Sequence, residues 1–302
     1  MNAVLFIVCA LVWGTTWRAI KYQLGPVDPM LSISYRFAAA SAALLLYCLI
    51  TKRRMKYSPK DHVFMALSGV FMFCLNYVCV YFAERDLPSG LVAVSMTTMI
   101  FLNALNNRIF LGAKLSSKTL LGGVVGIAGL SCIFYPEISS FSVTGVSGAA
   151  LALSLLGALS ASFGNTAAQV CQRREIPVVP LQAYAMLYGG LLTFLAAMVR
   201  RVPVTFDTTP GYVLSLLYLA VFGSVVAFMA YLTLLKNIGS DKAAYVTLMT
   251  PVVALSVSSI FEGYQWTGAA LVGVALIVYG NRIALQKNRK RGLFNYIFRA
   301  RE

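Results

Sequence analysis

Polar and aromatic side chains recur at helical spacing inside long apolar segments of the chain, and their chemistry is that of a binding cavity. Trp13, Trp17 and Lys21 follow an i, i+4, i+8 pattern, with Thr16 beside them. Residues four apart lie on one face of an α-helix. Polar side chains are costly in lipid, so they tend to face a bundle interior or a cavity. The spacing therefore predicts an aromatic, hydrogen-bonding face on this helix.

Similar faces recur in further apolar segments. Their members are Asn76, Tyr77, Tyr81 and Glu84; Met96, Met99 and Asn103; Ser162, Asn165 and Gln169; and Tyr231, Tyr245 and Met249. Together they favour a cavity with aromatic walls and neutral hydrogen-bonding groups, which suits a small amphipathic or zwitterionic metabolite. The alternative is that the small polar residues bridge helices and the aromatic ones form interfacial belts. Trp13 and Asn103 lie deeper than a belt, so for them we favour the cavity.

Arg36 is the most costly of these residues in a membrane, because it lies roughly 10 Å inside the apolar segment 29–50. We expect either a structural ion pair with Glu84 or, together with Arg18, a positive vestibule that favours carboxylates. The predicted substrate cavity comprises Trp13, Thr16, Trp17, Arg36, Asn76, Tyr77, Tyr81, Met99, Asn103, Asn165, Tyr231 and Tyr245.

The residue types of a membrane enzyme are sparse in this chain. His62 is its one histidine, and no H-E-x-x-H or His/Cys cluster supplies metal ligands. Gly145-Val-Ser147-Gly148 imitates the G-x-S-G of intramembrane proteases, but the expected topology separates Ser147 from His62 by roughly a bilayer thickness. The six cysteines form no C-x-x-C and are expected to be packing residues. We predict no catalytic site, no metal and no cofactor.

The composition is that of an integral membrane protein. The chain is 59% hydrophobic and 12% charged, with a mean hydropathy of +0.76. Apolar segments of spanning length, about 17–25 residues, are predicted at 3–21, 29–50, 62–83, 89–111, 119–135, 146–170, 180–199, 212–235, 243–261 and 267–283. The joining segments are short. We therefore expect an all-α membrane protein with ten transmembrane helices.

A sequence repeat with an offset of 151 residues divides these spans into two halves. The matching pairs are Ser89/Ser240, Ala93/Ala244, Phe110/Phe261, Gly112/Gly263, Ser116/Thr267 and Gly122/Gly273. Five intervening spans would invert the second copy, and inverted repeats surround a midplane site in many carriers. We predict a first five-helix repeat over 1–143, a second, inverted five-helix repeat over 144–284 and a basic tail over 285–302. Chance similarity between Ala-, Gly-, Val- and Leu-rich helices is the alternative.

The distribution of positive charge predicts the orientation. With the N-terminus in the cytoplasm, most of the 25 Lys and Arg residues fall in cytoplasmic loops and the tail. Both termini are therefore expected to be cytoplasmic, and the net charge of +15 needs no nucleic-acid partner. The tail is expected either to lie on the anionic lipid surface or to be solvated. The expected partners are the lipid bilayer and a small-molecule substrate, and the sequence fits a monomer or a homodimer.

Pro251 and Gly14 are the candidate hinge residues. Pro251 interrupts an apolar segment, frees a carbonyl and permits a bend. Gly14 permits close contact between helices. A static kink at Pro251 is the alternative to a moving hinge.

These motifs, in this order, resemble the ten-helix, EamA-type branch of the drug/metabolite transporter superfamily. The residues that carry the resemblance are Trp13-Gly-Thr-Thr-Trp17 with Lys21, Tyr35-Arg36-Phe37, the segment 87–93, and the segment 243–251 running on to Glu262-Gly263. The resemblance covers the chain up to the tail. It implies two inverted five-helix repeats around a central cavity, with alternating access between cytoplasm and exterior. Members of the family move amino acids, their derivatives or other small metabolites, often outward.

Two departures from the family pattern stand out. The family often has Gly-Glu where this chain has Gly112-Ala113 and Glu262-Gly263, and Arg18 stands where an apolar residue is expected. The expected function is a carrier of small metabolites in the bacterial inner membrane, most plausibly of amino acids or related compounds. The alternatives are a cationic drug efflux pump, which usually needs a buried carboxylate, and an intramembrane enzyme. The sequence has no acidic residue at the centre of a predicted span, which favours facilitated diffusion. The alternative is coupling that the sequence does not display, with Glu84 or Glu262 serving from the outer half.

Overall fold

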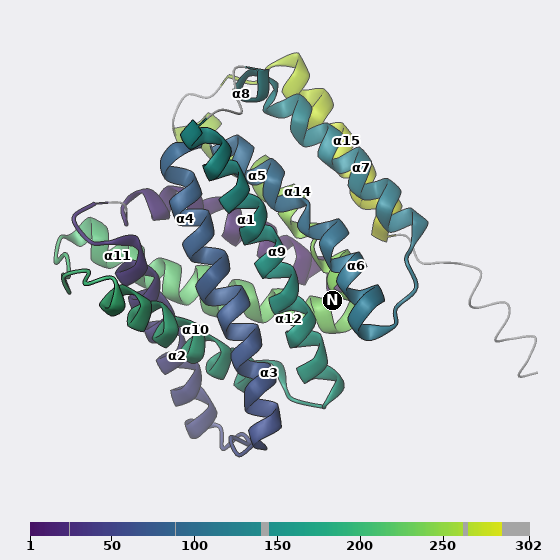
Figure 1. Cartoon of the computed structure of the whole chain (residues 1–302). Helices are drawn as coiled ribbons and strands as arrows, with labels where there is room; N and C mark the ends of the chain where they lie inside the picture. The colour runs from purple at the N-terminus through teal and green to yellow at the C-terminus, as the bar shows by residue number, and fades with distance from the viewer. Residues whose placement is uncertain (24, 88, 140–144, 262–264, 286–302) are drawn as a thin grey trace, which may run out of the picture.

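Long apolar stretches punctuated by proline and glycine give this chain a helical structure (Figure 1). The computed structural model describes residues 1–23, 25–87, 89–139, 145–261 and 265–285, and the regular elements in this part of the chain are helices. In chain order these are α1 (Asn2–Lys21), α2 (Pro29–Ile50), α3 (Pro59–Gly69), η1 (Val70–Leu75), α4 (Asn76–Asp86), α5 (Ser89–Thr97), α6 (Met99–Leu111), α7 (Ser117–Ile133), α8 (Tyr135–Ser139), α9 (Gly145–Arg173), α10 (Val178–Val199), α11 (Pro210–Tyr218), η2 (Leu219–Val226), α12 (Ala227–Ile238), α13 (Ser240–Ala243), α14 (Val246–Phe261) and α15 (Gly268–Leu285).

Local signals in the sequence set where several helices begin. The Asp28 side chain accepts a hydrogen bond from the backbone N–H of Met30, at the start of α2. Ser58 and Asp61 form a reciprocal capping box at the start of α3. Such caps satisfy backbone donors that a helix leaves unpaired. Pro29 and Pro59 stand in the first turns of these helices, where a missing N–H costs nothing.

Within the described residues, six helical runs are long and apolar enough to cross a membrane. They are Pro29–Ile50, Pro59–Asp86, Gly148–Arg173, Val178–Val199, Pro210–Ile238 and Gly268–Leu285. Asn2–Thr16 and Ser117–Ile133 are shorter apolar helices. The two other predicted spans, 89–111 and 243–261, are not single helices, because α5 ends before α6 begins and α13 ends before α14 begins.

Threonine hydroxyls bond back to the backbone at the break between α5 and α6. Thr97 and Thr98 donate hydrogen bonds to the carbonyls of Val94 and Ser95, three residues back in each case. The backbone N–H of Thr98 also bonds to Ser95, in a tighter turn than an α-helix makes. Side chains that bond back to the backbone in this way compete with the regular helical pattern. The sequence predicts one continuous helix over 89–111, whereas α5 and α6 are separate helices on either side of Thr98.

Two wide helical turns interrupt the longest runs. The segments η1 and η2 are π-helical, and they end at Leu75 and Val226, two positions separated by the 151-residue offset. A π-turn leaves some carbonyls without their usual partners and is common at functional sites. The carbonyl of Phe71 in η1 accepts a hydrogen bond from Ser160, and that of Gly223 in η2 accepts one from Trp13.

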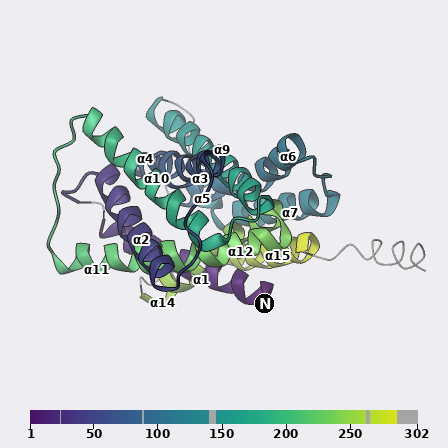
Figure 2. The same cartoon turned by 90° about the horizontal axis from the view of Figure 1, so that it is seen from below.

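Helices α7 and α15 pack along each other at glycines. Figures 1 and 2 show the two helices side by side at one end of the molecule, away from α2 and α11. A Cβ atom at Gly122 would stand 2.6 Å from the carbonyl oxygen of Gly280, and one at Gly129 would stand 2.6 Å from that of Gly273. Gly122 and Gly273, and likewise Gly129 and Gly280, are related by the 151-residue offset. Each glycine therefore contacts the counterpart of the other one, in antiparallel order.

The largest buried cluster lies on the other side of the molecule. It joins α1, α2, η1, α10 and α12 through buried apolar residues that include Phe37, Phe73 and Tyr231. Phe37 and Phe73 have ring centroids 5.0 Å apart, and Phe73 and Phe228 lie 4.8 Å apart. This aromatic packing fixes α2, η1 and α12 around the space described below.

The glycine crossing gives the first prediction. Gly129→Ala should lower the stability of the protein by roughly 1–3 kcal/mol, because the added methyl group collides with the backbone of α15. The midpoint of thermal unfolding in detergent measures this loss. Gly268→Ala is the matched control, since nothing lies within 4 Å of its added Cβ. Equal midpoints for the two variants would contradict the close crossing.

Candidate functional site

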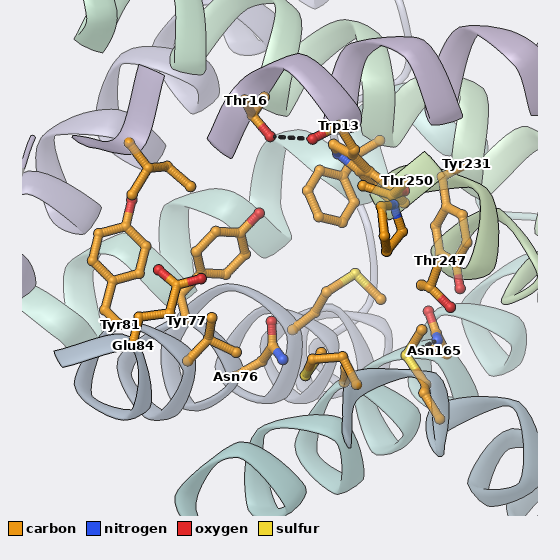
Figure 3. Close-up of a pocket in the computed structure, with 18 of the residues that line it drawn as sticks. Trp13, Thr16, Asn76, Tyr77, Tyr81, Glu84, Asn165, Tyr231, Thr247 and Thr250 are labelled. Carbon is orange, nitrogen blue, oxygen red and sulfur yellow. Dashed lines mark hydrogen bonds between the residues drawn. The ribbon is translucent and has the colours of Figure 1, made fainter. Parts of the chain in front are cut away.

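A cavity lies between helices drawn from both halves of the chain (Figure 3). Its lining residues are Trp13, Thr16, Ile20, Arg36, Met72, Asn76, Tyr77, Val80, Tyr81, Glu84, Met96, Met99, Ala161, Asn165, Phe228, Tyr231, Thr247, Thr250 and Pro251. Its volume is about 170 Å³. One water needs about 10–15 Å³ on this scale, so the cavity has room for a molecule on the order of ten non-hydrogen atoms.

Most of the side chains predicted to form the site lie together on this wall. They are Trp13, Thr16, Arg36, Asn76, Tyr77, Tyr81, Glu84, Met99, Asn165, Tyr231 and Pro251. The side chain of Trp17 lies outside the described part of the structure. Asn103 and Tyr245 were predicted to line the cavity, and both are buried beside it instead. Tyr245 donates its hydroxyl hydrogen to the carbonyl of Thr119 in α7, so it ties α7 to the turn that precedes α14.

Trp13 forms one wall of the cavity. Its indole Nε1 donates a hydrogen bond of 3.3 Å to the carbonyl of Gly223 in η2. Its ring centroid lies 5.0 Å from that of Phe228 and 5.2 Å from that of Tyr231. Thr16, one turn along α1, bonds back to the carbonyl of Trp13. The indole is thereby held by its polar end and packed by its apolar face, as buried tryptophans usually are.

Arg36 is held by partners other than the one predicted. Its guanidinium Nε donates to Ser224 Oγ at 2.8 Å, and Nη2 donates a longer bond of 3.4 Å to the hydroxyl of Tyr77. The guanidinium carbon also stands 5.0 Å from the Tyr77 ring centroid, a favourable cation–π distance. The residue is 2% exposed.

The predicted ion pair between Arg36 and Glu84 is not formed. Among the described residues, the salt bridge present joins Arg174 to Asp61 at 2.6 Å. The physical reason is the wide turn of η2, which brings the hydroxyl of Ser224 to the guanidinium in place of the carboxylate. Arg36 and Glu84 nevertheless line the same cavity.

The polar groups gather at two ends of the cavity. Figure 3 shows Tyr77, Tyr81 and Glu84 together at one end. The Oε1 atom of Glu84 is buried without a hydrogen-bond partner. At the opposite end of the same view are Asn165, Tyr231 and Thr247. A ligand spanning this space would meet charged groups at one end and neutral ones at the other.

The neutral end leads into a cluster of amides between helices. Asn165 Nδ2 donates to Asn103 Oδ1 at 3.4 Å, and Asn103 Nδ2 donates to the carbonyl of Ser240 at 3.0 Å. Gln169 Nε2 donates to Asn107 Oδ1 at 2.8 Å and to Ser240 Oγ at 2.6 Å. We call Asn103, Asn107, Gln169 and Ser240 the amide cluster. It links α6 to α9 and α13.

A second, more polar pocket lies beyond the amide cluster. It has a volume of about 790 Å³. Its lining includes Asn107, which also belongs to the amide cluster, and the charged residues Lys114, Arg173, Asp241 and Lys242. Burial raises the pKa of the Asp241 carboxyl. The amide cluster accepts a hydrogen bond from Asn165 on the cavity wall and includes Asn107 in this pocket, so it lies between the two spaces.

Several cavity residues escaped the sequence analysis. They are Ile20, Met72, Val80, Ala161, Phe228, Thr247 and Thr250, and Met96 was noted without being assigned to the site. The 151-residue offset was a usable signal for some of them. It maps Tyr77 onto Phe228, Met96 onto Thr247 and Met99 onto Thr250.

The two candidate hinge residues meet in space. A Cβ atom at Gly14 would stand 2.5 Å from Val253 and 3.1 Å from the carbonyl oxygen of Thr250, so α1 lies directly against α14 there. Pro251 stands inside α14 and lines the cavity. The absent N–H of Pro251 leaves the carbonyl of Thr247 without its usual intrahelical donor. The close contact between α1 and α14 therefore lies beside the cavity, next to the point where Pro251 weakens α14.

The described residues also bear on metal chemistry. They contain no group of three or more His, Cys, Asp or Glu side chains that would hold a metal ion. His62 bonds through Nδ1 to the hydroxyl of Tyr188 at 2.8 Å and packs against Tyr184, so its contacts are with tyrosines of α10. The side chain of Ser147 lies outside the described residues.

Comparison with known proteins finds relatives along nearly the whole chain. PagO of Salmonella typhimurium is 22% identical over 280 residues, which cover 92% of this chain and 90% of PagO. The uncharacterized inner membrane transporter YedA of Escherichia coli is 27% identical over 272 residues, covering 89% of this chain and 85% of YedA. A crystal structure that is 17% identical matches with a TM-score of 0.78, over 94% of this chain and 96% of that one, and so supports the fold alone.

A family model gives the broader assignment. The model described as the EamA-like transporter family matches residues 1–135 and 148–285, the two segments that together supply every residue lining the cavity. The chain belongs to the EamA-like transporter family.

Proposed function

We propose that the protein carries small metabolites, amino acids or related zwitterionic compounds, across the membrane by alternating access. The observation that carries this proposal is the cavity, which has aromatic walls, a charged end and a neutral end. It is built from α1, α2, η1, α4, α5, α6, α9, α12 and α14, so no single helix forms the site. A cavity between helix repeats is where carriers of this kind bind substrate.

The proposal includes ten transmembrane helices in two inverted five-helix repeats, 1–143 and 144–284, followed by the tail 285–302. Three observations support it. The family model matches two separate segments of similar length. The π-helical segments η1 and η2 end at equivalent positions. The glycines of α7 and α15 contact each other's counterparts, as a two-fold axis between the halves requires.

We further propose a bacterial inner membrane location with both termini in the cytoplasm. The long apolar helices support a multi-pass arrangement. The name of the relative YedA describes an inner membrane transporter, which supports the location. The orientation rests on the excess of Lys and Arg in the loops that would then be cytoplasmic.

Alternating access requires a barrier on each side of the substrate, and the amide cluster is suited to be one of them. It lies between the cavity and the second pocket, and its hydrogen bonds join α6 to α9 and α13. With the termini in the cytoplasm, Lys114, Arg173 and Lys242 put the second pocket on the cytoplasmic side. Gly14 and Pro251 are the proposed hinge, since α1 and α14 meet at these residues.

Efflux of cationic drugs is the second candidate function. The specific observation in its favour is Glu84, a carboxylate on the cavity wall with one oxygen unpartnered. Arg36 on the same wall opposes it, because a positive charge disfavours a purely cationic ligand. A panel of substrates separates the two candidates.

The transport proposal predicts saturable uptake of labelled amino acids by proteoliposomes that contain the purified protein. Trp13→Ala should reduce uptake at least about tenfold, because it removes a cavity wall and the indole bond to Gly223. Tyr279→Ala, which truncates an exposed aromatic residue on α15, is the matched control. Uptake of no amino acid, together with saturable transport of a quaternary ammonium dye, would favour drug efflux.

The barrier role of the amide cluster gives a separate prediction. Gln169→Ala removes the hydrogen bonds to Asn107 and Ser240. Each such bond contributes about 0.5–1.5 kcal/mol net, so opening should become about tenfold more frequent. Faster amide hydrogen exchange in α13 and the adjoining end of α6 measures it. Gln172→Ala, on the same helix but bonded to Leu232, is the control. Unchanged exchange in the first variant would exclude the cluster as a barrier.

A further inference from the structure

The guanidinium of Arg36, on the wall of the cavity, has one nitrogen without a partner. Nε and Nη2 donate to Ser224 and Tyr77, whereas Nη1 is buried and makes no hydrogen bond. Arginine keeps its charge in proteins, so Nη1 calls for an acceptor. The two existing bonds fix the guanidinium in place. An acceptor that arrives at Nη1 therefore meets a donor that is already positioned.

Glu84, on the same cavity wall, has a carboxylate oxygen that lacks a hydrogen-bond donor. Its Oε1 atom is buried and accepts no hydrogen bond, and Glu84 has no ion pair in the described structure. An ionised carboxylate only accepts hydrogen bonds, so it calls for a donor, and best a positively charged one. In Figure 3 its carboxylate lies next to the rings of Tyr77 and Tyr81. Tyr77 is also the residue to which Arg36 is bonded.

The two unmet needs point to one kind of ligand. A buried charge that lacks a partner is strongly unfavourable. A carboxylic acid would satisfy Arg36 and leave Glu84 unpaired, and an amine would do the reverse. A ligand that carries a carboxylate and an ammonium group on the same carbon atom could bind both residues at once. An α-amino acid is the simplest such ligand.

We propose that Arg36 binds the carboxylate and Glu84 the ammonium group of an α-amino acid with a large apolar side chain. This inference rests on the proposed transport function and assigns the residues that select its substrate. The side chain extends from the charged end toward Asn165 and Tyr231.

The remaining wall fits such a side chain. The cavity wall also includes Trp13, Met72, Met96, Met99 and Phe228. Methionine side chains are flexible and polarizable and adapt to apolar groups of different shape, and aromatic rings add large contact areas. This part of the wall carries no charged group.

Neither charge is duplicated in the other half of the chain. The 151-residue offset maps Arg36 onto Leu187 and Glu84 onto Leu235. A symmetric cavity would accept a ligand in two opposite orientations. The charged pair therefore defines one orientation, with the amino acid head group at the Tyr77 end.

Three ligands that share one side chain test the assignment: L-phenylalanine, 3-phenylpropionate, which lacks the ammonium, and 2-phenylethylamine, which lacks the carboxylate. Their affinities are measured by calorimetry on the full chain in lipid nanodiscs. Glu84→Gln should weaken L-phenylalanine about 10- to 100-fold and leave 3-phenylpropionate unchanged or tighter. Arg36→Gln should weaken L-phenylalanine and 3-phenylpropionate and leave 2-phenylethylamine unchanged. Retained binding of the insensitive ligand shows that each variant is folded.

Arg85→Gln and Asp86→Asn are the matched controls, because they remove one charge each from exposed positions on the same helix as Glu84. If Arg36→Gln does not fold, Arg36→Lys is the substitute, because it keeps the positive charge but removes Nη1. It should weaken the binding of L-phenylalanine and 3-phenylpropionate, the two ligands that carry a carboxylate, and leave that of 2-phenylethylamine unchanged. Equal weakening of all three ligands by either cavity variant would overturn the assignment. So would a Glu84→Gln protein that loses a pH dependence of transport but binds L-phenylalanine normally, since Glu84 would then carry a proton.

The failure of this inference differs from the failure of the proposed function. A protein that transports amino acids while its affinity for L-phenylalanine is absent, or is indifferent to both charges, overturns the head-group assignment alone. A protein that transports no amino acid overturns the proposed function as well.

Discussion

A guanidinium buried among membrane helices must find its hydrogen-bond partners inside the protein, and Arg36 finds them on segments from both halves of the chain. Ser224 belongs to η2 and Tyr77 to α4. The wide turn of η2 also leaves backbone carbonyls free, and two of them accept hydrogen bonds from Gln182 and Trp13. The buried guanidinium of Arg36 thus joins α2, α4 and η2 around the cavity. Its Nη1 atom has no hydrogen-bond partner and is available to bind a substrate.

The repeated sequence and the cavity are linked by a reversal of large and small residues. The 151-residue offset maps Trp13 onto Gly164 and Met72 onto Gly223. At one contact between the halves, the large Trp13 of α1 lies over the small Gly223 of η2. At the equivalent contact, the small Gly164 of α9 accommodates Met72 of η1, whose Cβ lies 2.8 Å from where a Cβ at Gly164 would stand. Both contacts therefore join a long helix of one half to a π-helical turn of the other, but only the first places an indole in the cavity.

Much of the site could be read from the sequence because helical spacing is a local property. Trp13, Tyr77 and Tyr81 could be placed on inward faces without knowing how the helices pack. The Arg36–Glu84 pair could not be judged this way, since it depended on Ser224 and on a π-turn that leaves no simple sequence pattern. The break at Thr98 was missed for a similar reason: apolar length predicts a span but does not show where a tighter backbone turn interrupts the helix.

In the carrier that we propose, binding and movement share the contact between α1 and α14. Trp13 and Gly14 are adjacent on α1, so the residue that touches the substrate cavity is followed by the one that lies against Val253 and Thr250. Because Gly14 has no side chain, the backbone of α1 lies directly against α14 at this contact. A small rotation of α1 would therefore displace α14. Because Pro251 removes one backbone hydrogen bond from α14, that helix yields more easily there than elsewhere. In this carrier, a ligand that displaces the Trp13 indole would shift α1 against α14 near Pro251, where α14 bends most easily.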